Sequence, residues 1–599
     1  MATANDYERS AGTLRDGVLT LHLVARPAQW HPTRDSDPAL PVDALSEEGK
    51  APSVPGPLLR APVGTRVRGT LRNALAETLV VNGLRERGPG TTERPLIVPP
   101  GESRPLDFTI NVPGAYGYYS ELHAGDKVIP GGHGTSLVGI IIGDTARAPR
   151  ERIMATTFWN RLIDSSAKAP EERVLFLING KIWPHTPRFT EQVGDTVRWR
   201  VVDLSFTEHP MHLHGFYFRV DSRGTLDVDS AYTPEQRRMV VTEATPAFGN
   251  FTLTWVPERA GNWIFHCHKP AHTWYGLRYT VTNTAAPDGP QPMRHDVLHV
   301  EDGMSGLVVA ISVRPRGTAV AQQSNGPRHR FRVLAQQRAG FYGVDGAGLG
   351  YVMRDGDAPP AADSIRIPGA PIVTTRGVPA EITVVNRTAY ATAVHWHGIE
   401  LESYYDGVAG WSGAGKRLAP MIAPGDSFVA RFTPPRAGTF IYHAHADDAW
   451  QMSHGLYAPL IVLEPGERWD PATDHVLLIA GGYANGKYVD VLNGSTAPPP
   501  LELRAGVKHR IRVINVTADE EADLGWFARA DTTDSTLVTW RAIAKDGAYL
   551  PARVAIERPA TVHINPGETW DFEVTPKVGD TQIRVRSFMR VAMPVVARE

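Results

Sequence analysis

A single cysteine, Cys267, is present among the 599 residues, so no disulfide can form within the chain. Cysteine usage therefore does not reveal the redox compartment. Neither sign of charge is in excess, because 62 Lys and Arg residues stand against 64 Asp and Glu residues, for a formal net charge of -2. This balance gives no electrostatic footprint for nucleic acid and no polybasic patch for a membrane surface.

Long hydrophobic runs are also lacking. No apolar stretch approaches the ~20 residues that a membrane-spanning helix needs. The N-terminal stretch MATANDYERSAGTLRDG has no basic region followed by an apolar one, the pattern of an export signal. We therefore expect no membrane partner and no nucleic-acid partner, and a cytoplasmic protein by default. A periplasmic or secreted protein is expected if a leader was removed.

Short segments rich in Val, Ile, Thr and Arg recur between the glycines and prolines, which number 56 and 49. Examples are TRVRGTLRN, DTVRWRVVD, AEITVVN and HRIRVINV. An α/β fold would need helices alternating with these segments, and long amphipathic helical patterns are scarce. The pattern predicts an all-β protein built of sandwiches or barrels.

The sequence contains a half-chain repeat. Residues 97–123 match residues 421–447, and residues 175–203 match residues 490–516, which gives the order A, B, A′, B′. At ~150 residues per domain, the length also indicates about four domains. We place these domains at residues 1–149, 150–292, 293–468 and 469–599.

The repeats differ at the histidines. The histidines of A′ are replaced in A, approximately, by other residues: His395 by Asn82, His397 by Leu84, His443 by Tyr119 and His445 by Glu121. The histidines and cysteine of B are replaced in B′ by Arg584, Val585 and Arg586. A and B′ are therefore predicted to be structural copies, whereas B and A′ carry the chemistry.

Cys267 lies between His266 and His268, after an apolar and aromatic lead-in that is typical of a strand. Successive strand side chains point to opposite faces, so the thiol would face away from both imidazoles. One strand could then serve two metal sites, with covalent bonds as the electron path between them. A thiolate with imidazoles and a weak or absent axial ligand is the blue-copper pattern. A buried thiol beside structural histidines is the alternative.

Four histidine clusters occur along the chain. They are His209, His212 and His214; His266, His268 and His272; His395 and His397; and His443 and His445. Each H-x-H pair places both imidazoles on one strand face. Imidazoles suit copper, and several copper ions would leave open positions for dioxygen. Surface histidines would explain any one pair, but the four clusters together favour a metal site.

With these motifs, HPMHLHG, HCHKPAH, HWHG and HAH, the sequence resembles the multicopper oxidases. The resemblance covers most of the chain, and its specific motifs lie in residues 209–277 and 395–462. It implies cupredoxin domains, which are Greek-key β-barrels, and a type 1, a type 2 and a binuclear type 3 copper.

By this resemblance the type 1 copper would be bound by His209, Cys267 and His272, with Leu277 at the axial position as a non-ligand. The type 2 copper would take His212 and His395. One type 3 copper would take His268, His397 and His443, and the other His214, His266 and His445.

The proton path is only partly implied by the resemblance. Asp406 matches the family's acidic residue near the type 2 copper and would relay protons, although a turn aspartate before Gly407 is an equal alternative. Where the family often has a glutamate after the second type 1 histidine, this chain has Thr273. Asp447 and Asp448 could substitute for it, or be solvated loop acids.

The order of the copper-binding domains is reversed relative to the common three-domain members, in which the HWHG domain comes first and the HCH domain last. The chain thus looks like two fused two-domain units that have each kept half of the site. The trinuclear site could lie within one chain or between two, and the oligomeric state stays open. We expect one chain, because B and A′ are consecutive.

We expect one-electron oxidation of phenols or aromatic amines, with electron entry at the type 1 histidines, His272 or His209, passage through Cys267, and reduction of dioxygen to water. Oxidation of ferrous or cuprous ions is the alternative, and it should place carboxylates beside the type 1 histidines, where Glu208 adjoins His209. A copper nitrite reductase would need fewer histidines, and a copper-sequestering protein would not consume oxygen.

Overall fold

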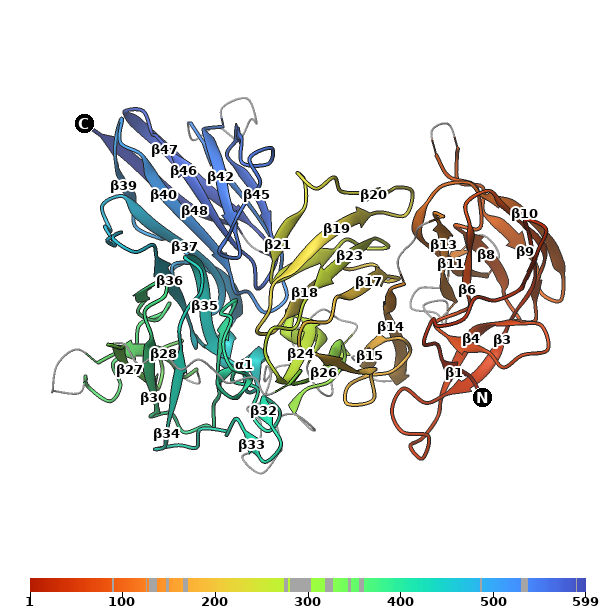
Figure 1. The fold of residues 1–599 in the computed structure, drawn as a ribbon, viewed down its shortest axis with the longest axis horizontal. Coiled ribbons are helices and arrows are strands. Elements are labelled where there is room, and N and C mark those ends of the chain that lie inside the picture. Colours follow the sequence, from red (N-terminus) through yellow and green to blue (C-terminus); the bar gives the residue numbers. More distant parts are fainter. Residues whose placement is uncertain are drawn as a thin grey trace.

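The computed structural model describes residues 1–88, 91–124, 127–128, 137–146, 150–164, 171–273, 278–280, 303–317, 327–342, 346–354, 360–484, 487–528, 537–588 and 590–599. Within these ranges the strands form eight sheets, and the one α-helix is α1 (Asp448–Ser453). No helix there has both the length and the hydropathy for crossing a membrane. The predicted all-β class is confirmed, and the sheets pair into domains in tandem (Figure 1).

The first and third domains share one topology. In the first, β7 (Thr65–Asn73) runs parallel to β3 (Val18–Trp30) and antiparallel to β10 (Ser103–Ile110). In the third, β30 (Ala380–Asn386) runs parallel to β27 (His329–Arg338) and antiparallel to β34 (Ser427–Phe432). Side chains of β30 alternate between buried and half-buried positions, as expected of a strand with one face on a core.

The register of the second sheet in each of these domains aligns the repeat. In the first domain, β8 (Thr78–Asn82) and β11 (Gly114–Ala124) place Asn82 opposite Tyr119. In the third, β31 (Val394–His397) and β35 (Gly438–Ala444) place His395 opposite His443. β13 (Val138–Asp144) flanks β11 as β36 (Tyr457–Leu463) flanks β35. The polar pair in the first domain thus stands where the third has two histidines.

The second and fourth domains also correspond strand by strand. In the second, β18 (His209–Leu213) pairs with β24 (Gly261–Cys267) so that Met211 lies opposite Cys267. In the fourth, β41 (Ala522–Phe527) pairs with β47 (Gly579–Arg586) so that Leu524 lies opposite Val585. In the fourth domain, the apolar pair Leu524 and Val585 therefore stands where the second domain has Met211 and Cys267.

The second domain extends beyond the predicted boundary at residue 292, which lies outside the described residues. β26 (Val308–Arg314), assigned to the third domain by the prediction, pairs with β24 and runs parallel to β16 (Arg188–Gln192). β48 (Arg590–Arg598) holds the same place in the fourth domain, beside β47 and parallel to β39 (Leu501–Arg504). The correction follows from sheet closure, because the barrel needs this last strand.

At the other two predicted boundaries, the strands that follow belong to new sheets. β14 (Arg152–Asp164) pairs with β15 (Glu171–Ile178) and β17 (Val197–Asp203) in the second domain. The fourth domain begins with β37 (Asp474–Ala484), which runs parallel to β40 (His509–Asn515). The predicted breaks before residues 150 and 469 therefore fall between sheets.

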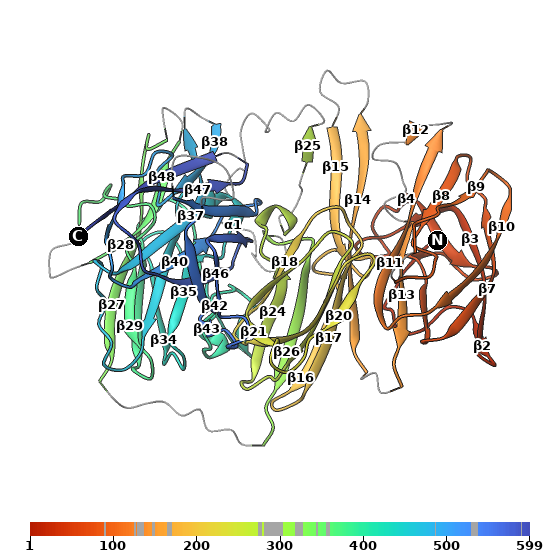
Figure 2. The same ribbon diagram turned by 90° about the horizontal axis from the view of Figure 1, so that it is seen from above.

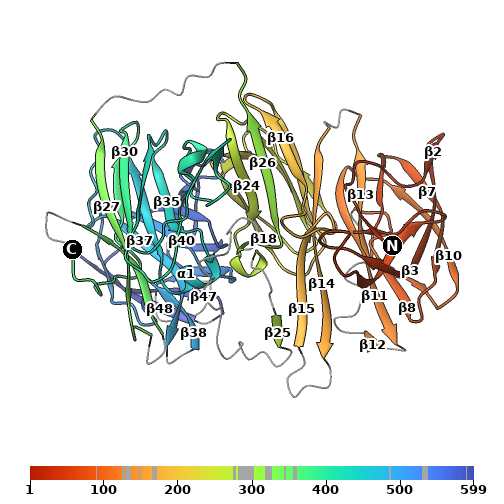
Figure 3. The same ribbon diagram turned by 90° about the horizontal axis from the view of Figure 1, so that it is seen from below.

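The second domain occupies the centre of the molecule, between the first domain and the adjoining third and fourth domains (Figures 2 and 3). Apolar clusters join the first domain to the second and the third to the fourth. The second and third domains meet through a smaller cluster that includes Trp183, Ile264 and Val408. A short strand of the third domain, β32 (Gly413–Ala414), also pairs with β24 at Asn262. These contacts fix the second and third domains face to face.

Candidate metal centre

β24 is buried along both faces, and its two faces serve different purposes. Trp263, Phe265 and Cys267 point into the apolar core of the second domain. The alternate residue Ile264 belongs to the cluster shared with the third domain. His266 lies on that same face, since side chains alternate along a strand. The thiol and its neighbouring imidazole thus point to opposite sides, as the sequence predicts.

The first group of possible ligands is built by three elements of the second domain. His209 begins β18, Cys267 ends β24, and His272 lies in the 3-10 helix Pro270–His272. The Cys267 Sγ lies 3.8 Å from Nδ1 of His209 and 3.5 Å from Nδ1 of His272, and the two Nδ1 atoms are 3.1 Å apart. All three side chains are buried. Leu277, expected at the axial position, lies outside the described residues.

The outward nitrogens of these two histidines have different partners. The Nε2 of His209 lies 2.9 Å from the hydroxyl of Ser205. The Nε2 of His272 lies 3.5 Å from Oδ1 of Asp519, a residue of the fourth domain that is 40% exposed. The ring of Phe176 packs on His272 with centroids 3.9 Å apart. The His272 edge therefore faces a half-exposed carboxylate.

The second centre lies between the second and third domains of the same chain. The Nε2 atoms of His212 and His395 are 3.3 Å apart, and those of His214 and His266 are 3.0 Å apart. Possible ligand atoms lie within 4.8 Å of one another in four groups: His212, His395 and His397; His214, His266 and His445; His268, His397 and His443; and His214, His395 and Asp406. Every histidine that the resemblance implied for the trinuclear site is in this cluster.

Hydrogen bonds at the outer nitrogens orient most of these rings. Nδ1 of His212 donates to the Val241 carbonyl at 2.9 Å, and Nδ1 of His395 donates to the Asp406 carbonyl at 2.7 Å. Nδ1 of His443 likewise donates to the Ala444 carbonyl at 2.8 Å. Such bonds fix the tautomer and leave the Nε2 lone pair for a metal.

The donor set fits copper. Burial lowers the pKa of His209 and of His443 to about 3, and that of His266 to about 4. These imidazoles are therefore neutral near pH 7, the state in which they bind a metal. The buried Nε2 of His443 has no hydrogen-bond partner among the described residues, which a bound ion would supply. Burial also raises the pKa of the Cys267 thiol to about 12, so a metal would displace its proton.

Asp406 lies against the cluster. Its Oδ2 accepts from Nδ1 of His214 at 2.8 Å and from the hydroxyl of Ser412 at 3.0 Å, and the side chain is fully buried. It also ends a short 3-10 turn before Gly407. Its position therefore fits both an acid beside the histidines and a turn aspartate. A hydrogen-bond acceptor at this position orients the His214 ring.

Asp447 and Asp448 differ from the solvated loop acids that were one of the two expectations for them. Asp447 is buried and Asp448 is 15% exposed, so neither is a solvated loop acid. The Oδ2 of Asp448 lies 3.9 Å from Nδ1 of His445. Thr273 donates its hydroxyl to the Pro270 carbonyl at 3.2 Å and so stabilises the turn that holds His272.

The contribution of the fourth domain was missed from the sequence. Asp519 reaches His272, and Gly567 contacts His268, although this domain supplies none of the grouped ligand atoms. The only sequence signal was the acid-rich stretch 519–521, which gave no indication of its target.

Comparison with known proteins finds two segments of the chain that match one family. Two family models, each described as multicopper oxidase, match residues 149–287 and 364–467. The multicopper oxidase MmcO of Mycobacterium tuberculosis is 39% identical over 101 residues, which are 17% of this chain and 18% of that protein. Copper resistance protein A of Pseudomonas syringae is 36% identical over 171 residues, 27% of this chain and 24% of that protein.

Among solved structures, the multicopper oxidase of Pseudomonas thermotolerans aligns with a TM-score of 0.36 at 20% identity, over 46% of this chain and 65% of that chain. Of the curated relatives reported above, the chain spans less than a third of the length. The matched segments contain the histidine motifs. Residues 149–287 and 364–467 of the chain are thus identified as multicopper oxidase segments.

Proposed function

We propose that the chain is a copper oxidase that takes single electrons from a small donor and passes them to dioxygen. The observation that carries this proposal is the division of β24, which presents Cys267 to one buried centre and His266 to another. Bound copper would supply the one-electron steps, and four electrons with four protons would convert one dioxygen to two water molecules.

In this proposal the residues of the chain have separate roles. His209, Cys267 and His272 would hold the copper that receives electrons, and the peptide bonds of Cys267 lead to the histidines on either side of it. Asp406 orients His214 and can hold a proton at the carboxylate beside the second centre. Burial excludes bulk water from both centres.

An aromatic surface beside His209 favours a phenolic or aromatic-amine donor. Phe206 follows Ser205, whose hydroxyl contacts His209, and its side chain is 63% exposed. The Phe206 ring lies 4.9 Å from that of Phe248 and 6.1 Å from that of Phe158. Such a cluster can stack with an aromatic ring.

The carboxylates beside His272 favour a second candidate, oxidation of ferrous or cuprous ions. Asp519 lies at the outer nitrogen of His272 and is half-exposed. Glu521, also 40% exposed, pairs with the buried Lys269 at 3.0 Å. A metal-ion oxidase is expected to hold its cation at such a position, and the sequence alone offered only Glu208.

Substitution of Cys267 tests the oxidase proposal. Cys267→Ser should abolish the intense blue absorption and oxygen uptake with either kind of donor, because serine does not supply a thiolate to copper. The circular dichroism spectrum should be unchanged. A variant that stays blue would contradict the assignment.

Two surface variants decide between the donors. Phe206→Ala should lower kcat/KM for a phenol about twofold to twelvefold, which corresponds to the ~0.5–1.5 kcal/mol that an aromatic contact contributes. It should leave Fe(II) oxidation unchanged. Asp519→Asn should lower kcat/KM for Fe(II) and Cu(I) by about tenfold if the cation binds there, and leave phenol oxidation unchanged. The donor whose rate responds is the one that the site is built for.

A further inference from the structure

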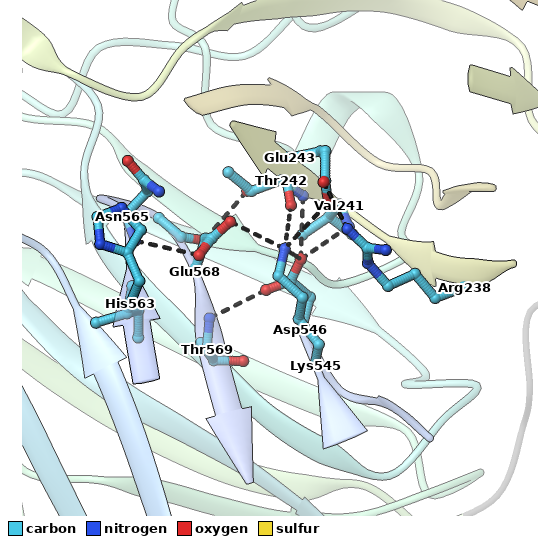
Figure 4. Close-up of polar contacts among 12 residues, drawn as sticks. Arg238, Val241, Thr242, Glu243, Lys545, Asp546, His563, Asn565, Glu568 and Thr569 are labelled. Carbon is cyan, nitrogen blue, oxygen red and sulfur yellow. Dashed lines mark hydrogen bonds and ion pairs between the residues drawn. The ribbon is translucent and has the colours of Figure 1, made fainter. Parts of the chain in front are cut away.

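The fourth domain, which supplies none of the grouped ligand atoms, contacts the second domain directly beside the cluster of histidines. The contact strand is β22 (Thr242–Thr245), which pairs with β18 so that Thr242 lies opposite His212. Two turns of the fourth domain face it, one after β42 (Thr539–Lys545) and one after β45 (Thr561–Ile564). Figure 4 shows the polar side chains that gather at this junction.

One of the clustered histidines lacks the usual outer hydrogen bond. Neither ring nitrogen of His268 has a hydrogen-bond partner among the described residues, although the side chain is buried. A metal-binding histidine is normally oriented by a bond from its second nitrogen. The orientation of His268 must therefore come from packing.

Gly567 supplies that packing. This glycine has a φ of +80°, and a Cβ added to it would lie 2.5 Å from Cγ, 2.7 Å from Cδ2 and 2.9 Å from Nδ1 of His268. The bare backbone of the fourth domain thus forms the wall against which the His268 ring lies. Any side chain at residue 567 would displace the ring.

The carbonyl of Gly567 reaches two further histidines through Thr242. The Thr242 hydroxyl donates to this carbonyl at 3.1 Å. The same hydroxyl lies 3.1 Å from Nδ1 of His212 and 3.4 Å from Nε2 of His397, from which it can accept. This turn of the fourth domain therefore contacts His268 directly and reaches His212 and His397 through Thr242.

Asp546 and Lys545 fix Thr242 from both sides of its peptide. Oδ2 of Asp546 accepts from the amides of Val241 and Thr242 at 3.2 and 3.1 Å. Nζ of Lys545 donates to the Thr242 carbonyl at 2.5 Å. Both residues belong to a two-residue hairpin in which Lys545 pairs with Ala548, and Asp-Gly favours such a turn.

The junction is charged and buried, and its charges are matched. Lys545 lies 3.0 Å from Glu568, 3.5 Å from Asp546 and 3.7 Å from Glu243. Glu568 also accepts from the amide of Asn565 and so closes the turn that presents Gly567. Burial opposes ionisation of Glu243, but Arg238 and Lys545 lower its pKa to about 2. Such a pairing is costly to break, so the two turns are held in one position.

We propose that Gly567, Thr242, Lys545 and Asp546 are positioning residues through which the fourth domain sets the geometry of the trinuclear histidines. The inference rests on the proposed copper centre. The fourth domain supplies none of the grouped ligand atoms, but it orients His268 by packing. It also positions His212 and His397 through the Thr242 hydroxyl that both rings contact.

Gly567→Ala tests this inference, and Gly506→Ala is the matched control. Both glycines lie in turns of the fourth domain with φ of +80° and +73°, but a Cβ at residue 506 meets nothing within 4 Å. Copper per chain and the electron paramagnetic resonance spectrum are measured after loading. We expect Gly567→Ala to keep the blue absorption of Cys267 and to lose most of the remaining copper, whereas Gly506→Ala matches the unsubstituted chain.

Thr242→Val is the second variant, since it keeps the volume and removes the hydroxyl. It should shift the resonance signal of the type 2 copper and leave the blue absorption in place. Full copper content with unchanged spectra in both Gly567→Ala and Thr242→Val would overturn the positioning role. If Gly567→Ala does not fold, unchanged spectra in Thr242→Val alone overturn it. Failure of the unsubstituted chain to bind copper would overturn the proposed function itself, and this inference with it.

Discussion

The same residue type is used in two orientations in the two centres. His209 and His272 turn Nδ1 towards Cys267 and Nε2 outward, to Ser205 and Asp519. In the cluster, His212 instead turns Nδ1 outward to a backbone carbonyl. The outer partner decides which nitrogen remains for the metal, so the surroundings define each site as much as the histidines do.

Asp406 gives the clearest test at this scale. Asp406→Asn keeps the shape of the side chain but removes the charge that accepts from His214. We expect oxygen uptake to fall about 10-fold to 100-fold, as is typical when an outer partner of a metal ligand is changed. Asp426→Asn, at an exposed position of the same domain, is the control. Equal turnover in both variants would show that Asp406 only forms the turn before Gly407.

At the scale of elements, strand periodicity made much of the site predictable. The H-x-H spacing places two imidazoles on one face, and His266 and Cys267 lie on opposite faces of β24, as the structure shows. Contacts between residues of different domains were not predictable from strand periodicity. Asp519 and Gly567 reach their histidines from turns far along the chain, and spacing along one strand carries no information about such contacts.

The missed extent of the second domain has the same kind of cause. In the fourth domain β47 and β48 are joined by a short turn, whereas residues 268–307 separate β24 from β26. This longer connection, which carries His272, breaks the correspondence in spacing between the two halves before the last strand. Pairing with β16 and β24 assigns that strand without reference to length.

His563 on β45 predicts a pH dependence of the contact between the second and fourth domains. Hydrogen bonds to Glu208, and then to Asp523, raise the pKa of His563 to about 9 against the effect of burial. Because this value exceeds the unfolded value of 6.5, the stabilisation is complete below pH 6.5 and is lost as the pH rises through about 9. The imidazole is 45% exposed, so we expect less than ~1 kcal/mol.

The measurement is Tm against pH for the copper-loaded chain and for His563→Gln. The two proteins should differ most near pH 6.5 and converge above pH 9. His329→Gln, which removes a ring bonded to Thr374 in the third domain, should show no such convergence. A constant difference between the chain and His563→Gln across this range would contradict the role of the proton.

At the scale of the whole molecule, the second and third domains supply the possible metal ligands, and the fourth domain lies against their cluster. The apolar junctions of each half are similar, but the second and fourth domains meet through the buried ion pair of Glu243 and Lys545. The repeat and its asymmetry in histidines were evident from the sequence. The contact of the fourth domain with the second was not evident, because a sequence repeat carries no information about contacts between its halves.

Mixing of two inactive variants tests whether one chain builds the trinuclear site. The Nε2 atoms of His212 in the second domain and His395 in the third lie 3.3 Å apart within a single chain. We therefore expect a mixture of His212→Ala and His395→Ala chains to remain as inactive as each alone. Recovery of oxygen uptake on mixing would mean that ligands are exchanged between chains.

The most direct test of the account is the copper content of the unsubstituted chain, measured by mass spectrometry of the metal together with the protein concentration. One group containing Cys267 and one cluster of eight histidines predict about four copper ions per chain, and about three in Cys267→Ser. A content of about one copper per chain, with no change on substitution of His395, would contradict a trinuclear centre between the second and third domains.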